Sequence, residues 1–382
     1  MLPDPYHGPS PWGPRVPVPR REGYPVRNWR VWLGFIISLA FLAFAFRGQD
    51  LGEIRDALGQ TDYRLLVPAL CLYFAGVWVR AIRWSILLRP ITTLTARQVF
   101  PVVIVGYTAN NVLPLRTGEV VRAYLLGRQT GVKKTSTLAT IAIERLFDGL
   151  TMLSFMLAAT TVVSFTSQLR QLTLVAFILF AGVLIGLFVL TLGGSFRDRL
   201  LQLVLGPLPI PLADRVERVA ESFLSGLGVL RRASDLGLVA GTSVLAWLCE
   251  AGMYWVIARA LGTDFAAVLG VAETLLTTGV ANLATLIPSS PGYVGPFEAG
   301  VLLVVNGALG VQRELALTYA ILVHAALFFP ITIIGLVLGS RFHLSLRGIQ
   351  DLKADPDVPD PARESSGPMT SGSATTRPTP TP

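Results

Sequence analysis

Two polar segments that contain proline interrupt the apolar runs of this 382-residue chain. They span residues 110–119 and 282–298, and the residues around both are apolar enough for a membrane interior. Backbone amides and carbonyls are not left unpaired in lipid, so such breaks persist only where protein or a water-filled cavity satisfies them. Matched breaks in the two halves of a chain are typical of transporter binding sites. We therefore expect a polar site at bilayer depth.

The composition is that of a membrane protein. The chain is 52% hydrophobic and 15% charged, with a mean hydropathy of +0.57, whereas soluble domains are roughly 25% charged. We predict an all-α polytopic integral membrane protein. The two cysteines and three histidines show no ligand spacing, so we expect no metal and no cofactor. Phosphate-loop and nucleophile motifs are also missing, and we expect no catalytic residue.

Apolar runs near the length of a bilayer crossing predict about six full spans. They are residues 31–47, 65–88, 136–163, 171–192, 236–261 and 315–339. Two further apolar regions, 98–128 and 267–308, contain the breaks, and we interpret them as re-entrant helical hairpins. The count rises to eight or more spans if these hairpins cross the bilayer.

The distribution of positive charge predicts the orientation. With the N-terminus in the cytoplasm, 23 of the 32 lysines and arginines fall on the cytoplasmic side. Six fall outside, and three, Arg80, Arg83 and Arg145, lie within spans. This bias predicts that both termini are cytoplasmic. It also explains the net charge of +8 without a nucleic-acid partner.

The chain divides into two halves between tails. Residues 1–30 and 346–382 are predicted to be disordered cytoplasmic tails, and residues 31–345 a transmembrane domain. Its halves are about 31–192 and 236–340. In the predicted orientation, the span before the first hairpin crosses the bilayer in the opposite direction to the span before the second, which predicts an inverted-topology repeat. Between them, residues 213–232 predict an interfacial amphipathic helix, with an amphipathic helix packed on the protein itself as the alternative.

Both breaks end where a helix is expected to restart. Thr117 is placed to cap the first restarted helix, and Pro296 to begin the second. Helix N-termini attract anions, and Arg116 and Arg122 flank the first one, where they could hold a phosphate. Alternatively, these arginines pair with Glu119 or extend to the cytoplasmic interface.

Ionisable residues within spans define a second group of candidates. Glu144 and Asp148 lie four residues apart on one helical face, with Arg145 between them. Charges at this depth are costly and are expected to face a cavity or partners, and Arg80 and Arg83 are the expected partners. A purely structural ion-pair network is the alternative.

His324 and Glu298 suggest proton coupling in the second half. His324 lies 26 residues after Glu298, much as Glu144 lies 25 residues after Glu119. Glu144, Asp148, Glu298 and His324 are therefore candidate proton carriers. The alternative for His324 is a packed, hydrogen-bonded side chain.

Together, these motifs identify a family resemblance. In chain order they are Arg80-x-x-Arg83-Trp84, Asn110-Asn111-x-x-Pro114-x-Arg116-x-Gly118-Glu119-x-x-Arg122, Glu144-Arg145-x-x-Asp148 and Pro291-Gly292-x-x-Gly295-x-Phe297-Glu298. The chain resembles the lysylphosphatidylglycerol synthase transmembrane-region family over about residues 30–345. The resemblance implies a lipid-translocating domain of the bacterial cell membrane. We expect a stand-alone member without the aminoacyl-transferase domain of the bifunctional members.

The leading hypothesis is a flippase that moves an anionic headgroup through a central polar cavity. Its substrate would be an anionic phospholipid or a polyprenyl-phosphate-linked lipid. The expected binding residues are Arg80, Arg83, Asn110, Asn111, Arg116, Glu119, Arg122, Glu144, Arg145, Asp148, Asn282 and Glu298. The alternatives are an intramembrane polyprenyl-phosphate-dependent glycosyltransferase-like enzyme, or a non-transporting partner of envelope-assembly enzymes. Two kinds of protein partner are also considered: a second copy of the chain, which would give a homo-oligomer, and a protein of envelope biosynthesis.

Overall fold

A computed structural model describes residues 29–48, 50–113, 117–163, 167–192, 210–287 and 289–341. The predicted tail 346–382, nearly all of the tail 1–30, and Arg116 lie outside the described residues. Within these ranges the chain is helical and contains no strand. The prediction of an all-α protein is therefore confirmed.

The helices coincide with the apolar runs, because a helix pairs its backbone groups internally and can be buried in lipid. The long helices are α1 (Trp29–Phe46), α3 (Leu66–Leu88), α4 (Ala96–Val112), α5 (Gly118–Thr130), α6 (Lys134–Ala159), α7 (Ser167–Leu192), α9 (Ile210–Gly226), α10 (Ala233–Ala260), α12 (Val271–Ala284) and α14 (Arg313–Arg341). The short elements are α2 (Leu51–Gly59), η1 (Tyr63–Leu65), η2 (Leu227–Arg231), α11 (Thr263–Val268), η3 (Pro291–Tyr293), α13 (Pro296–Leu302) and η4 (Leu303–Ala308).

Four stretches in the described part of the chain are long and apolar enough to cross a membrane. They are Tyr63–Leu88, Thr173–Thr191, Ala233–Ala260 and Arg313–Ser340. This supports a multi-pass membrane protein. The six-span count and the re-entrant character of the two broken hairpins stay predictions.

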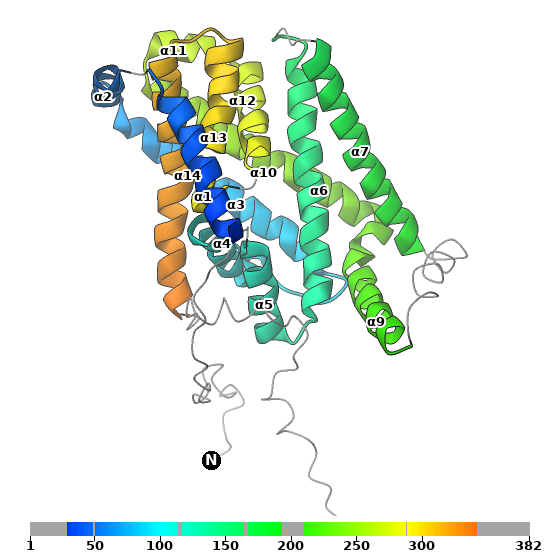
Figure 1. Ribbon diagram of the computed structural model, residues 1–382. Helices are drawn as coiled ribbons and strands as arrows, with labels where there is room; N and C mark the ends of the chain where they lie inside the picture. Colours follow the sequence, from blue (N-terminus) through cyan, green and yellow to red (C-terminus); the bar gives the residue numbers. More distant parts are fainter. Residues whose placement is uncertain are drawn as a thin grey trace, which may run out of the picture.

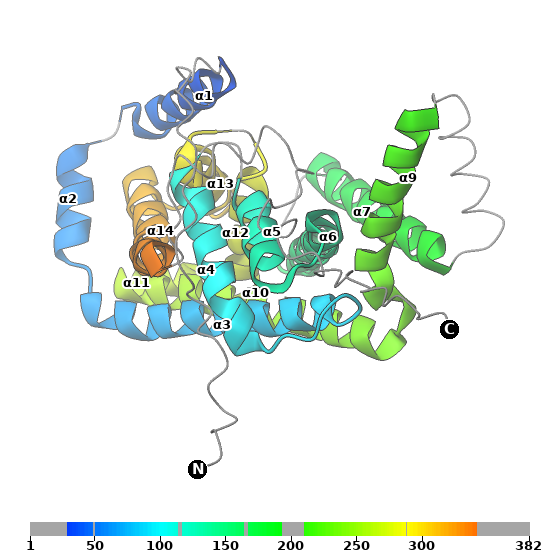
Figure 2. The same ribbon diagram turned by 90° about the horizontal axis from the view of Figure 1, so that it is seen from below.

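The two halves are interleaved (Figure 1). The hairpin α4–α5 lies in the lower part of the molecule and α12–α13 in the upper part, both between α14 and α6. Helix α4 packs against α14, and α12 packs against α6. Helices α3 and α10 lie side by side along one edge, steeply inclined to α6 and α14, as Figure 2 shows from below. Each broken hairpin therefore packs on a long helix of the other half.

Helix α9 occupies the predicted amphipathic segment and packs on the start of α6. The Ser136 hydroxyl donates to the Ser222 carbonyl at 2.7 Å. A Cβ on Gly226 would lie 2.2 Å from the Ser136 carbonyl oxygen, so only glycine permits this approach. These contacts support the alternative in which the helix packs on the protein, although its outer face is also exposed.

The contact of α4 with α14 also depends on a glycine. The Thr108 hydroxyl donates to the Ile331 carbonyl at 3.0 Å. A Cβ on Gly335, one turn further along α14, would lie 1.8 Å from the Thr108 hydroxyl oxygen. The absence of a side chain at Gly335 therefore sets how closely the two halves approach.

We predict that Gly335→Ala destabilises the protein by about 1–3 kcal/mol, because the added methyl overpacks this contact. Thermal unfolding of the purified protein in detergent measures the loss. Gly339→Ala is the matched control on the same helix, since a Cβ there meets no atom within 4 Å. Equal unfolding temperatures for the two variants would contradict the described α4–α14 contact.

Candidate functional site

The first break is closed by an asparagine. Helix α5 begins at Gly118, and the Gly118 amide donates to the Asn110 side-chain oxygen at 2.7 Å. Thr117, the expected cap, makes no side-chain capping bond. Thr117 does occupy the N-cap position, as expected, but the amide of Gly118 is satisfied by Asn110 on the preceding helix. Asn110 thus stabilises the break itself.

The second break is held by Glu298 and His324, which the fold brings together as a hydrogen-bonded pair. Helix α13 begins at Pro296, as predicted, and Glu298 accepts from the Gly295 amide at 2.7 Å. His324 Nδ1 lies 2.5 Å from Glu298 Oε1, and Nε2 lies 2.8 Å from the Gly292 carbonyl oxygen. A carbonyl oxygen only accepts, so Nε2 carries a hydrogen. The proton between Nδ1 and Glu298 is consequently shared by the pair.

The other two asparagines also bind the protein itself. The Asn111 amide donates to the Thr332 hydroxyl of α14 at 2.9 Å. The Asn282 amide donates to the Thr278 carbonyl at 2.9 Å and to the Tyr254 hydroxyl at 3.2 Å. Both side chains are partly exposed, so they keep some capacity for a ligand. Their present contacts tie the breaks to α14 and α10.

A buried ion network lies between α3, α5, α6 and α10. Arg83, which is fully buried, contacts Asp148 through both terminal nitrogens at 2.6 and 3.3 Å. Arg122 makes a two-point pair with Glu144, with both distances 2.9 Å. Such paired, hydrogen-bonded charges are the form in which arginine and carboxylate groups are tolerated away from water. Arg83 is a confirmed partner of the 144–148 segment.

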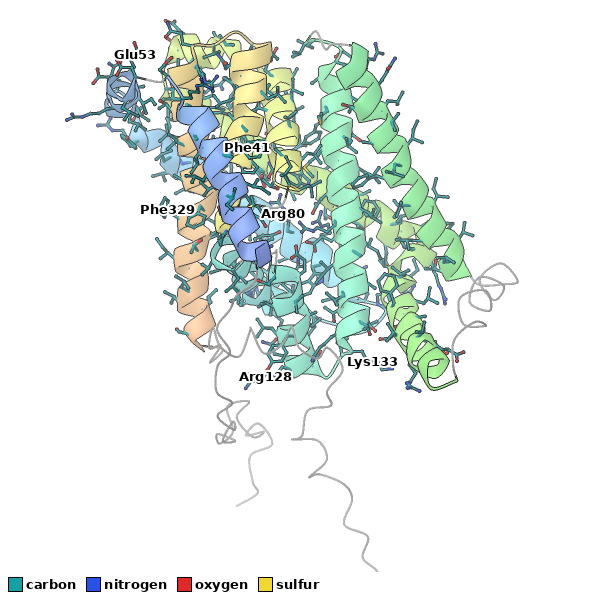
Figure 3. All side chains as sticks on the ribbon, viewed as in Figure 1. Phe41, Glu53, Arg80, Arg128, Lys133 and Phe329 are labelled. Atoms are coloured by element: carbon teal, nitrogen blue, oxygen red, sulfur yellow. The ribbon has the colours of Figure 1, made fainter. Side chains whose placement is uncertain are left out.

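Arg80 pairs elsewhere. Its guanidinium contacts Glu250 on α10 at 2.7 Å and lies 4.7 Å from the centre of the Trp247 ring. Trp247 in turn donates its indole hydrogen to Asp148 at 2.8 Å. The expectation that Arg80 pairs with residues 144–148 is therefore wrong, because α10 supplies a carboxylate directly beside it. Figure 3 places Arg80 in the interior of the molecule.

Sequence reasoning missed several contributors to the network. They are Glu250, Trp247 and Ser243, whose hydroxyl accepts from Arg83 at 2.9 Å. Trp84, which the family motif contains without a role, has its ring 4.1 Å from the Arg122 guanidinium. The usable signal was Glu250, the one carboxylate in the apolar run 236–261. Its pairing with Arg80 could be predicted only from the packing of α3 on α10.

Arg145 differs from the other arginines of the network. Its terminal nitrogen contacts Glu144 at 2.5 Å and Asp148 at 3.3 Å, yet its side chain is 39% exposed. Its Nε is buried and has no hydrogen-bond partner. Arg145 is thus the cation through which this network reaches an accessible surface.

By direct contact among the described residues, the network joins more cations than anions. Arg80, Arg83, Arg122 and Arg145 contact the carboxylates of Glu144, Asp148 and Glu250, so four cations meet three anions. Glu119, on the first turn of α5, makes no direct ion pair with Arg145 but lies close enough to offset part of this excess, and its Oε2 is buried without a hydrogen-bond partner. An excess cation in a low-dielectric setting attracts an anion strongly. Among the described residues, no group of histidine, cysteine, aspartate and glutamate could hold a metal.

Comparison with known proteins now gives the family. Residues 31–335 match the family described as the lysylphosphatidylglycerol synthase TM region. The chain belongs to this family. The match covers both broken hairpins and the whole ion network.

Several curated proteins are similar to this chain. Glycosyltransferase AglD of Haloferax volcanii is 28% identical over 360 residues, which cover 87% of this chain and 57% of AglD. A UPF0104 membrane protein of Methanothermobacter thermautotrophicus is 29% identical over 302 residues, or 74% of this chain and 87% of that protein. The chain therefore spans little more than half of AglD but most of the UPF0104 protein.

We predict that Arg83→Gln and Arg145→Gln differ sharply in stability. Loss of Arg83 leaves Asp148 buried without its main cation and should cost about 3–5 kcal/mol. Loss of Arg145 should cost about 1 kcal/mol or less, because Glu144 and Asp148 each keep an arginine and the side chain is partly solvated. Thermal unfolding in detergent compares the two. Equal losses would show that Arg145 is as integral to the fold as Arg83.

Proposed function

We propose that the protein moves the anionic headgroup of a membrane lipid between the two leaflets. The observation that carries this proposal is the partly exposed Arg145 guanidinium at the edge of a buried network in which four arginines contact three carboxylates. A phosphate oxygen is the natural partner of such a group, since arginine binds phosphate through charge-assisted hydrogen bonds. The substrate is an anionic phospholipid or a polyprenyl-phosphate-linked lipid.

The buried pairs give Arg145 its freedom to bind. When a phosphate engages Arg145, Glu144 retains Arg122 and Asp148 retains Arg83. The two carboxylates are therefore not left uncompensated, which would be costly at this depth. Arg145 exchanges partners while the rest of the network stays intact, and Asn111 and Asn282 at the breaks supply further polar groups.

The arrangement of the hairpins supports alternating access through an inverted repeat. The two broken hairpins lie in opposite parts of the molecule, and each packs on a long helix of the other half (Figure 1). A shift of one half against the other would open the site to one face while closing it to the other. Arg128 and Lys133 mark the face that the charge distribution predicts to be cytoplasmic (Figure 3).

A second candidate function is glycosyl transfer from a polyprenyl-phosphate sugar within the membrane. The name of the relative AglD, which matches 87% of this chain, favours it. The match covers 57% of AglD, so that name belongs to a protein with much sequence beyond the matched part. A transferase would require a carboxylate base, for which Glu144 and Asp148 are the candidates.

We predict that Arg145→Gln abolishes headgroup movement while the protein stays folded. Purified protein in liposomes that contain a fluorescent anionic phospholipid or a polyprenyl phosphate reports movement through quenching from one side. Arg128→Gln, which removes an exposed cation on the lower face, is the matched control and should move lipid normally.

Mass spectrometry of the same liposomes separates the alternatives. A new covalent lipid product would favour the transferase. Protein that neither moves nor modifies lipid would favour the non-transporting partner. Normal movement by Arg145→Gln would remove Arg145 from the phosphate site.

We also predict that single cysteines at Leu113 and Ile287, which follow the ends of α4 and α12, are reachable from opposite sides of the membrane. The native Cys71 and Cys249 are first replaced by alanine, and impermeant thiol reagents are added to sealed vesicles from either side. Labelling of both positions from one side would contradict the inverted arrangement.

A further inference from the structure

A second charged cavity lies away from the central network, where α3 ends and α10 begins. It has a volume of about 560 Å³ and is open on one side. Its polar lining comes from Arg89, Glu221, Ser225, Arg231, Arg232 and Asp235. Helix α9 forms one wall, and Gly228 brings η2 against Pro90, since a Cβ there would lie 2.8 Å from the Pro90 ring. The cavity is thus built by packed elements.

The arginines of this cavity are incompletely paired. Arg89 contacts Asp235 at 2.6 Å but is 48% exposed. The Arg231 Nε–H donates to the Thr191 carbonyl at 2.8 Å, and among the described residues its two terminal nitrogens have no hydrogen-bond or ion-pair partner. Within the described ranges, the Arg232 side chain is exposed and has no ion-pair or hydrogen-bond partner; its backbone amide donates to the Val229 carbonyl. Three cations against two carboxylates make the cavity attractive to an anion.

The cavity lies beside the end of an apolar helix. Thr191, which binds Arg231, is in the last turn of α7, a helix long and apolar enough to cross a membrane. Val183, Ile185 and Val189 of that helix are exposed, as is expected of side chains that face acyl chains. Figure 1 shows α9 below the lower end of α7 and to its left. An arginine fixed to the end of a lipid-facing span is positioned beside headgroup phosphates.

We propose that this cavity binds the phosphate of an anionic phospholipid headgroup, at a site separate from the translocation site. Arg231 and Arg232 contact the phosphate, and Arg89, held in place by Asp235, adds a third cation. The acyl chains of the lipid lie along the exposed face of α7. Glu221 lines the same cavity and opposes anion binding.

Native mass spectrometry of the full chain tests the site with an equimolar mixture of phosphatidylglycerol and phosphatidylcholine. The Arg145→Gln background removes any contribution of the central site, so the result is independent of the proposed transport function. Arg232→Gln should reduce retained phosphatidylglycerol about tenfold, since it removes charge-assisted hydrogen bonds. Glu221→Gln should increase retention, because it removes a carboxylate from the lining.

Matched controls make the same substitutions, arginine to glutamine and glutamate to glutamine, at positions outside the cavity. They are Arg128→Gln on the same side of the molecule and the exposed Glu217→Gln one turn earlier on α9, and both should behave like the background. Equal effects of cavity and control variants, or equal retention of the two lipids, would overturn the proposal. Retention of glycerol 3-phosphate without phosphatidylglycerol would assign a soluble phosphate compound and overturn the lipid assignment.

Discussion

The structure depends on how charge is neutralised inside an apolar bundle. Arg83 and Arg122 are each buried against a carboxylate of α6, and Arg80 against one of α10. Breaking such a pair strands a charge in a medium that stabilises it poorly. The helices that carry these side chains are consequently fixed relative to one another, and α3, α5 and α6 of the first half are linked to α10 of the second.

Much of the helical layout could be predicted from the sequence because lipid permits few alternatives. Apolar length alone anticipates α10 and α14 to within a few residues of their observed ends. The prolines and asparagines of the two breaks anticipate where α4 and α12 stop, since Pro114 and Pro288 cannot continue a helical hydrogen-bond ladder. The short helix α2 was not anticipated, because nine residues of mixed character lack a membrane signal.

The site could be predicted only in part. The contact of Arg83 with Asp148 follows from charges on adjacent spans that must find partners. The contact of Arg80 with Glu250 joins residues 170 positions apart and follows only from the packing of α3 on α10. Likewise, Asn110 was expected to face a ligand, but local geometry places its oxygen on the Gly118 amide. The residue types correctly indicated which positions are polar. Which polar side chains contact one another, such as Arg80 with Glu250, follows from how the helices pack.

The Glu298–His324 pair also bears on how the protein responds to membrane voltage. Wherever its shared proton lies, the two side chains together carry no net charge. A neutral segment does no work against a membrane potential, whereas each elementary charge moved across 100 mV exchanges about 2.3 kcal/mol. Displacement of this pair as a unit therefore moves no net charge across the membrane, and only rotation of an ionised pair would contribute. Any voltage dependence would report displacement of other charged groups, such as the arginines of the ion network.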